Sequence, residues 1–438
     1  MDLIELSGNL VNLLQGTNFV YLRTVPEVPD YTINSNFLLV LSSKNGTLSY
    51  EVTPQNILEV VGMLDCTVFE EDVILITWNI KSFASYFKFY SKKYLNPKNS
   101  KFYDLKIIEN FHNLRENAPE NLNQSLDRLK RVHKNLPKIY HSIHLKLALK
   151  LLPSIESYPL TNELVRRPEY PFYEIEGQAN GRLNCVKKLS KSYSPHHLSS
   201  EIKAILKPRI NTDCRFVYAD YSFCEAAVLQ WLSGDRLIKS IIESGADLYE
   251  KIYQIISGQK CESEENRKIS KKLFLPVMYG LGPKQLSENI KISENLSKEV
   301  IKHIRHHFKD AYDWLTSQQE MAKQGPVVDY FGRSRVYESS SAYLCRNFLV
   351  QAAAATFCQE KLILLHEEIE NNYLGDANIC FSVHDGYGLV CNTKKCPEIY
   401  KTIKNTCTSE SILCPGLKLN MNIQFGARLN HMKTFWKD

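Results

Sequence analysis

The stretch FSVHDGYGLV, residues 381–390, constrains the fold most, because it sets a tight Asp385–Gly386 turn between two mostly apolar runs. Apolar runs joined by such a turn predict a β-hairpin. The hairpin would carry the carboxylate of Asp385 at its tip, beside His384. Two interpretations follow: either Asp385 only makes the turn, or it holds a metal ion there.

Length and composition fit a soluble protein of two or three domains. The chain has 438 residues, of which 44% are hydrophobic and 23% charged, and both fractions are ordinary for globular proteins. A formal net charge of +6 permits a nucleic-acid partner without requiring one. The N-terminus lacks a basic region followed by an apolar run, and no stretch approaches 18 apolar residues. We expect a cytoplasmic protein, of a cell or of a phage or virus host, that does not use a membrane.

The cysteine and histidine patterns do not favour a metal site. The 12 cysteines include no Cys-x-x-Cys pair, and the closest two are Cys391 and Cys396. Reduced thiols in an intracellular protein are the favoured interpretation. His303, His306 and His307 lie in a Lys- and Glu-rich helical pattern, which is typical of a solvated helix face.

The pattern of elements divides the chain into an N-terminal α/β unit and a larger C-terminal domain. Short apolar runs at 18–24, 37–43, 46–52 and 72–78 predict strands. From 120 to 152 the pattern turns helical, with Lys and Arg among Leu and Ile. From about 170 strands and helices alternate to the end, which predicts an α/β or α+β domain.

Asp220 lies where a predicted strand, 216–219, gives way to a helix that begins after Ser222. A carboxylate at a strand end is a candidate ligand, but Asp is also a common helix N-cap. The sequence at this point leaves both roles open.

The stretch ENRKISKKLFLPVMYGLG, residues 265–282, places Arg267, Lys271, Leu275 and Tyr279 four apart along one helical face. Two cations one turn apart suit a polyphosphate, because Arg can bind two oxygens and Lys acts as a point charge. A solvated basic face would have the same spacing. Pro276 is expected to bend the end of this helix.

Two further stretches offer candidates for nucleic-acid contacts. GRLN (181–184) and GRSRVY (332–337) set Arg182 and Arg333 beside a glycine in predicted turns, where an arginine either contacts phosphate or is simply exposed. Residues 343–357 predict a buried helix on which Asn347 and Gln351 share a face. Their amides could bind bases or make core hydrogen bonds.

The order of these motifs resembles the family A DNA polymerases, the group of bacterial DNA polymerase I and its phage relatives. The order of three motifs is that of the family: DYSFCE, then RKISKKLFLPVMYG, then VHDG. The resemblance runs from about Gly177 to the C-terminus. It implies an α+β right-hand polymerase domain, with an antiparallel palm sheet and helical fingers. It also implies a template-directed DNA polymerase that extends a DNA primer–template with dNTPs.

The resemblance assigns roles to single residues. Asp220 and Asp385 match the family's two metal-binding aspartates, with the backbone carbonyl of Tyr221 as a further ligand for two Mg²⁺ ions, or Mn²⁺. The dNTP-binding positions correspond to Arg267, Lys271, Tyr279, Glu225, Leu275 and Tyr249, with Glu225 as the glutamate that screens the sugar's 2′ position. The primer–template positions correspond to Arg182, Asn347, Gln351 and His384.

Three positions depart from the family pattern. The family usually has Glu after His-Asp, where this chain has Gly386, which we interpret as an easy turn. Leu275 replaces an aromatic residue, and Tyr249 replaces a phosphate-contacting His. Sugar selection therefore stays open, and the alternatives are an RNA-synthesising or sugar-tolerant, primase-like polymerase and an inactive polymerase-fold scaffold.

The N-terminal third resembles the family's 3′–5′ exonuclease, an RNase H-like α/β fold, without its acidic residues. FVYLRTVPEV lacks the Asp-x-Glu, Phe83 replaces an Asp, and the expected Tyr-x-x-x-Asp reads Tyr140 and His144. We expect a degenerate exonuclease-like domain at 1–118, a reduced helical thumb or linker at 119–170, and palm and fingers at 171–438, with fingers at about 236–330. A short thumb predicts weak grip on duplex, so low processivity or a processivity partner. A small polymerase without proofreading would suit a phage, virus or mobile element.

Overall fold

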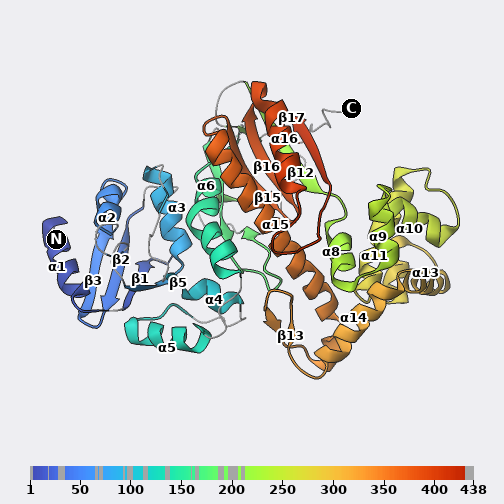
Figure 1. Ribbon diagram of the computed structural model, residues 1–438, viewed down its shortest axis with the longest axis horizontal. Helices are drawn as coiled ribbons and strands as arrows, with labels where there is room; N and C mark the ends of the chain where they lie inside the picture. Colours follow the sequence, from blue (N-terminus) through green and yellow to red (C-terminus); the bar gives the residue numbers. More distant parts are fainter. Residues whose placement is uncertain are drawn as a thin grey trace. The chain divides into compact units, whose positions relative to one another are not determined.

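The computed structural model describes residues 3–17, 19–27, 35–64, 68, 73–91, 94–95, 102–111, 117–133, 139–158, 160–162, 167–185, 192–195, 206–208 and 213–429 (Figure 1). The chain forms two compact units. The first comprises Met1–Asp220, Gln359–Thr406 and Asn422–Asp438, and the second comprises Tyr221–Cys358 and Cys407–Met421. Each unit thus combines segments that are distant in the sequence.

A five-stranded sheet is the core of the N-terminal segment, with strand order β3-β2-β1-β4-β5. β2 is antiparallel to β1 and β3, whereas β4 is parallel to β1 and β5. The strands are β1 (Phe19–Val25), β2 (Phe37–Ser43), β3 (Gly46–Val52), β4 (Ile74–Trp78) and β5 (Phe102–Asp104), and the helices are α1 (Leu3–Leu14), α2 (Ile57–Leu64), α3 (Ile80–Ser91) and α4 (Leu105–Phe111). The four strands expected from the sequence are confirmed.

Helices follow in the segment expected to be helical, 120–152. They are α5 (Leu122–His133), the π-helical turns η3 (Tyr140–His144) and η4 (Leu147–Leu151), and α6 (Leu152–Ser157). Residues 134–138, 159 and 163–166 of the expected thumb segment lie outside the described residues. α6 packs on α3 through a buried ion pair, in which Lys81 Nζ lies 2.7 Å from Glu156 Oε1. This ion pair joins the helical segment, through α6, to helix α3 of the N-terminal segment.

A second main sheet, with order β15-β16-β12-β17, carries the predicted hairpin. Its strands are β12 (Cys214–Tyr221), β15 (Ala377–Val383), β16 (Gly386–Asn392) and β17 (Met421–Gly426), and helix α16 (Cys396–Cys407) follows β16. β16 is antiparallel to both β12 and β15. One face packs into a cluster of buried side chains: Leu160, Tyr193, Phe216, Cys380, Phe381 and Val390. The hairpin is therefore confirmed, and it is anchored in a core.

Two small sheets complete the described part of the first unit. One has the order β10-β7-β6-β11 and the other pairs β8 with β9. Their strands are β6 (Leu160–Asn162), β7 (Arg167–Pro171), β8 (Tyr173–Glu174), β9 (Asn184–Cys185), β10 (Ser192–Tyr193) and β11 (Leu206–Pro208).

The second unit is mainly helical. Its helices are α8 (Cys224–Ser233), α9 (Arg236–Glu243), α10 (Leu248–Ser257), α11 (Glu264–Met278), α12 (Pro283–Ile290), α13 (Glu294–His307) and α14 (Lys309–Ala322), followed by the hairpin β13 (Val327–Val328) and β14 (Ser334–Arg335). Asp235, Asp247 and Ser263 cap the N-termini of α9, α10 and α11 through their side-chain oxygens, which satisfies N–H groups that a helix leaves unpaired. The three histidines of α13, His303, His306 and His307, are exposed, as the sequence predicts.

The long helix α15 (Leu344–Asn372) contains the predicted buried helix. By length and composition alone it could cross a membrane, but 89% of its apolar window is buried within the protein. That burial is the environment of a core helix.

Candidate active site

Asp385 lies in the two-residue turn that joins β15 to β16. The turn is His384–Asp385 rather than the expected Asp385–Gly386, because Gly386 already belongs to β16 and pairs with Val383. His384 is exposed and adopts a left-handed φ of 52°, which is the conformation that short hairpin turns demand at their first position. The turn holds Asp385 at the end of the sheet.

Asp220 lies near the end of β12 and pairs in register with Gly386, the residue after Asp385. Cross-strand partners have Cβ positions about 4.5–5.5 Å apart, so the two aspartates lie at the same end of the sheet. The pKa of the Tyr218 phenol is raised well above its usual value. Burial is the largest cause, and the negative charges of Asp220 and Asp385 add to it. The phenol is therefore protonated at neutral pH, and its hydroxyl lies beside the Asp220 carboxylate, next to Gly386.

Gly386 is a glycine because its neighbours leave no room for a side chain. A Cβ at this position would lie 2.8 Å from Asp220 Oδ1 and 2.8 Å from Tyr218 Cζ, and closer still to the Tyr218 hydroxyl. Gly386 is not one of the described glycines that adopt a left-handed φ. The expectation that Gly386 makes an easy turn is therefore wrong, since crowding on the sheet, and not the turn, excludes a side chain.

The two aspartates suit a divalent cation. Carboxylate oxygens are hard ligands of the kind that Mg²⁺ prefers, and Mg²⁺ sites in enzymes often use one or two carboxylates plus substrate phosphates. Across the described residues, no group of three or more His, Cys, Asp and Glu side chains gathers at one place. Tyr221, the third predicted ligand, is buried, and its hydroxyl donates to the Cys407 carbonyl at 2.9 Å.

Helix α11 carries the cationic candidates of the second unit, as the four-residue spacing predicts. Arg267 is half-buried and forms an ion pair with Asp247, with Nη2 and Nε at 2.8 and 2.9 Å from Oδ2. Its guanidinium also lies 5.6 Å from the ring centroid of the buried Tyr249. Lys271, one turn later, is exposed. The sequence did not single out Asp247, although its place before an amphipathic helix marks it as an N-cap.

Glu225, on the first turn of α8, is held from two other helices. Tyr279, the residue that caps the C-terminus of α11, donates its hydroxyl to Glu225 Oε2 at 2.9 Å. Gln351 of α15 donates to Oε1 at 3.4 Å. Leu275 is half-buried one turn before Tyr279, and Pro276 lies inside the last turn of α11. The second unit thus joins two predicted nucleotide-binding residues, Glu225 and Tyr279, and the predicted primer–template residue Gln351 in one hydrogen-bonded group.

A cavity of about 260 Å³ lies in the second unit beside Asp247 and Phe223. Its lining residues are Ser222, Phe223, Ala227, Ile242, Gly245, Ala246, Asp247, Lys418, Leu419 and Asn420. Because Asp247 also binds Arg267, the cavity adjoins the partner of a predicted phosphate-binding side chain.

The primer–template candidates lie on a turn and a helix. Arg182 is half-buried and follows Gly181, whose φ of 74° makes the turn and whose carbonyl accepts from Gln359 Nε2 at 2.7 Å. Asn347 lies one turn before Gln351 on α15. In the described part of the chain, the buried Oδ1 of Asn347 has no hydrogen-bond partner.

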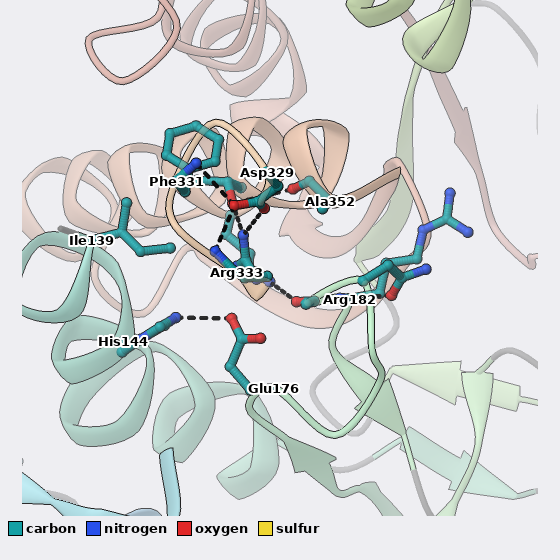
Figure 2. Close-up of polar contacts among 12 residues, drawn as sticks. Ile139, His144, Glu176, Arg182, Asp329, Phe331, Arg333 and Ala352 are labelled. Atoms are coloured by element: carbon teal, nitrogen blue, oxygen red, sulfur yellow. Dashed lines mark hydrogen bonds and ion pairs between the residues drawn. The ribbon is translucent and has the colours of Figure 1, made fainter. Parts of the chain in front are cut away.

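Arg333 is a structural residue and not a surface phosphate ligand (Figure 2). Its side chain is fully buried, and Nη1 lies 3.0 Å from Asp329 Oδ2 and 3.0 Å from Thr356 Oγ1. The other oxygen of Asp329 accepts the backbone N–H groups of Phe331 and Arg333. The sequence suggested an exposed turn arginine because its pattern does not reveal this buried carboxylate.

The first-unit positions at which the sequence resemblance expects exonuclease residues are filled by core contacts. Phe83, Tyr140 and His144 are fully buried. Tyr140 Oη accepts the backbone N–H of Asp104 at 2.5 Å, and His144 Nε2 lies 2.9 Å from Glu176 Oε1 (Figure 2). These side chains are engaged within the protein and present no carboxylate pair to solvent.

Comparison with known proteins decides the family. The sequence model of "DNA polymerase family A" matches residues 170–431. This chain belongs to that family. The family A chain is 26% identical over 332 residues to DNA polymerase I of Helicobacter pylori, an alignment that covers 67% of this chain and 36% of that protein. It is 29% identical over 160 residues to the DNA polymerase of Mycobacterium phage L5, which covers 35% of this chain and 25% of the phage protein.

A solved structure shows the same fold. The POL domain of Pol1 from M. smegmatis, in complex with DNA primer-template and dNTP, superposes with a TM-score of 0.72 at 13% identity, covering 98% of this family A chain and 99% of that one. The chain spans about a third of the length of the Helicobacter relatives.

Proposed function

We propose that this family A chain is a template-directed DNA polymerase that adds dNTPs to the 3′ end of a DNA primer. The observation that carries the proposal is the pair Asp220, near the end of β12, and Asp385, in the turn just before the paired strand β16, at one end of an antiparallel sheet. This arrangement suits metal-dependent phosphoryl transfer, since two carboxylates can share divalent cations with the phosphates of a substrate.

In this proposal Asp220 and Asp385 hold two Mg²⁺ ions, or Mn²⁺, with the Tyr221 carbonyl as a further ligand. Held by these residues, the ions would supply activation of the primer hydroxyl and stabilisation of charge on the transferred phosphate. The aspartates fix where that charge is balanced, and the pairing of β12 with β16 holds the backbone of Asp220 and of the turn at Asp385 in register, which is the positional part of catalysis.

The side chains of α11 bind the incoming nucleotide. Arg267 and Lys271 neutralise the triphosphate, which is an electrostatic task. Asp247 pairs with the Arg267 guanidinium before the nucleotide binds. When the triphosphate binds, a phosphate replaces the Asp247 carboxylate, so the guanidinium has an anionic partner in both states. Tyr279 and Leu275 contact the nascent base pair and sugar, and the Tyr249 ring centroid lies 5.6 Å from the Arg267 guanidinium.

Glu225 selects the sugar. Because Tyr279 and Gln351 both bind it, its carboxylate has a fixed position from which to screen the 2′ carbon. This supports deoxynucleotide selection over the sugar-tolerant alternative, which the experiment below tests directly. Primer and template are contacted by Arg182, Asn347, Gln351 and His384.

We also propose that 1–118 is a degenerate 3′–5′ exonuclease-like domain without proofreading activity. The strand order β3-β2-β1-β4-β5, with β1, β4 and β5 parallel, supports an RNase H-like sheet. The buried contacts of Phe83, Tyr140 and His144 support its inactivity, because a two-metal nuclease needs carboxylates at these positions. Residues 119–170 then form a reduced thumb, and 171–438 the palm and fingers, with fingers at about 236–330. A processivity factor would supply grip that this thumb lacks.

Primer extension tests the proposal. A labelled primer–template is incubated with the chain, Mg²⁺ and either dNTPs or rNTPs. Extension with dNTPs is expected, and degradation of a mismatched primer end is not. Equal use of rNTPs would instead support the sugar-tolerant polymerase, and no extension with either would support the inactive scaffold.

A further inference from the structure

Two glycines on β16 face side chains of neighbouring strands. In the register of the sheet, Gly386 lies opposite Asp220 and Gly388 lies opposite Tyr218. A Cβ at Gly388 would meet the ring of Phe381 inside 3.0 Å, whereas a Cβ at Gly386 would meet Tyr218 and Asp220 inside 3.0 Å. Each glycine therefore makes room for a different neighbour, and the neighbour at Gly386 belongs to the metal-binding end of the sheet.

Tyr218 connects the core to that end. Its ring packs against the buried cluster that includes Phe216 and Phe381, and its hydroxyl and Asp220 Oδ1 both lie within 3.0 Å of the point that a Cβ at Gly386 would occupy. Tyr218 and Asp220 are two residues apart on β12 and so point to the same face. A carboxylate has about four lone-pair positions, and a donor fixed by the core fills one and sets the rotation of the others.

We propose that Tyr218 is a positioning residue, whose phenol orients the Asp220 carboxylate and occupies the space of the side chain missing at Gly386. The inference rests on the proposed polymerase function for the identity of the metal, and on the sheet geometry for the Tyr218–Gly386 pair. The site then uses two carboxylates and a hydroxyl in place of a third acidic side chain. A hydrogen bond to a metal ligand typically affects metal affinity or activity about 10–100-fold.

The first test removes only the hydroxyl. Tyr218→Phe is expected to raise the Mg²⁺ concentration for half-maximal single-nucleotide extension by about 10–100-fold, with KM for dNTP at saturating Mg²⁺ within about twofold of wild type. Mn²⁺ binding without nucleotide, measured by electron paramagnetic resonance, should weaken by the same factor. Tyr400→Phe, a half-buried tyrosine on α16, is the control and should change neither. Unchanged Mg²⁺ dependence and Mn²⁺ affinity in Tyr218→Phe would overturn the proposal.

The second test needs no metal. Gly386→Ala is expected to lower the melting temperature by about 1–5 °C, as overpacking does, and at least half of that loss should disappear in the Tyr218→Ala background. Gly388→Ala, which meets Phe381 instead, should cost the same in both backgrounds. A Gly386→Ala loss that is independent of residue 218 would overturn the pairing.

The two failures can be told apart. A wild-type chain that binds Mn²⁺ but does not extend primers contradicts the proposed function, whereas the Tyr218 inference is still decided by Mn²⁺ affinity and melting temperature. A wild-type chain that extends primers with a Tyr218→Phe variant of normal metal dependence contradicts only the inference.

Discussion

Removing the hydroxyl of Tyr279 should weaken the discrimination against ribonucleotides. The hydroxyl donates to Glu225 Oε2 at 2.9 Å, and a hydrogen bond to a charged group contributes about 1.5–3 kcal/mol. Both side chains are partly exposed, so about 1–2 kcal/mol is expected. At 1.36 kcal/mol per factor of ten, Tyr279→Phe should lower the dNTP:rNTP ratio of kcat/KM by about 5–30-fold.

Two further variants serve as comparisons, one expected to have a smaller effect on the dNTP:rNTP ratio and one a larger effect. Gln351 donates to the same carboxylate at 3.4 Å, which is near the limit of a hydrogen bond, so Gln351→Leu should lower the ratio by about twofold. Glu225→Ala removes the carboxylate itself and should lower the ratio most. The assay is single-nucleotide extension under single-turnover conditions with paired dNTP and rNTP titrations. A normal ratio for Tyr279→Phe beside a strongly lowered ratio for Glu225→Ala would show that the tyrosine does not position Glu225.

Three further predictions concern binding and stability. Lys271→Ala should raise KM for dNTP about tenfold through loss of a charge-assisted contact of about 1.5 kcal/mol, whereas the exposed neighbour variant Lys272→Ala should leave KM unchanged in the same titration. Lys81→Met should lower the free energy of unfolding by about 3–5 kcal/mol, because it leaves the buried carboxylate of Glu156 without its cation, and urea denaturation that shows a loss no larger than for Lys272→Met would contradict this. Burial, with nearby lysine charges, lowers the pKa of His366 from 6.5 to about 4, so only the unfolded chain gains this proton between those values. Stability should therefore be retained above pH 6.5 and fall by about 3 kcal/mol towards pH 4, and His366→Leu should flatten that part of the pH profile of urea midpoints.

The sequence predicts the strands and the hairpin because alternation of apolar residues and turn residues is a local property. It places the turn one residue too late, since Asp385–Gly386 is a common turn pair but the ladder closes with Val383 opposite Gly386. The reason for that glycine lies on another strand, in Tyr218 and Asp220. Sequence spacing alone could have identified Tyr218 as a neighbour of the site, because a residue two positions before Asp220 on a strand must lie on the same face.

Other contacts have no local signal. Asp247 and Arg267 are 20 residues apart and meet because α10 and α11 pack side by side. Arg333 looks like any arginine after a turn glycine, and only the fold reveals that Asp329 and Thr356 surround it. The spacing of α11, by contrast, needs only helical geometry, so its face could be predicted correctly.

Single-turnover extension by Asp220→Asn and Asp385→Asn variants decides whether these two carboxylates bind the catalytic metal ions. Both changes keep the size of the side chain and remove its charge, so unfolding temperatures serve as the check that the sheet is intact. We expect each variant to incorporate dNTP at least about 100-fold more slowly than wild type at saturating Mg²⁺. Near-normal incorporation by either folded variant would contradict the assignment of these two carboxylates as the metal-binding pair.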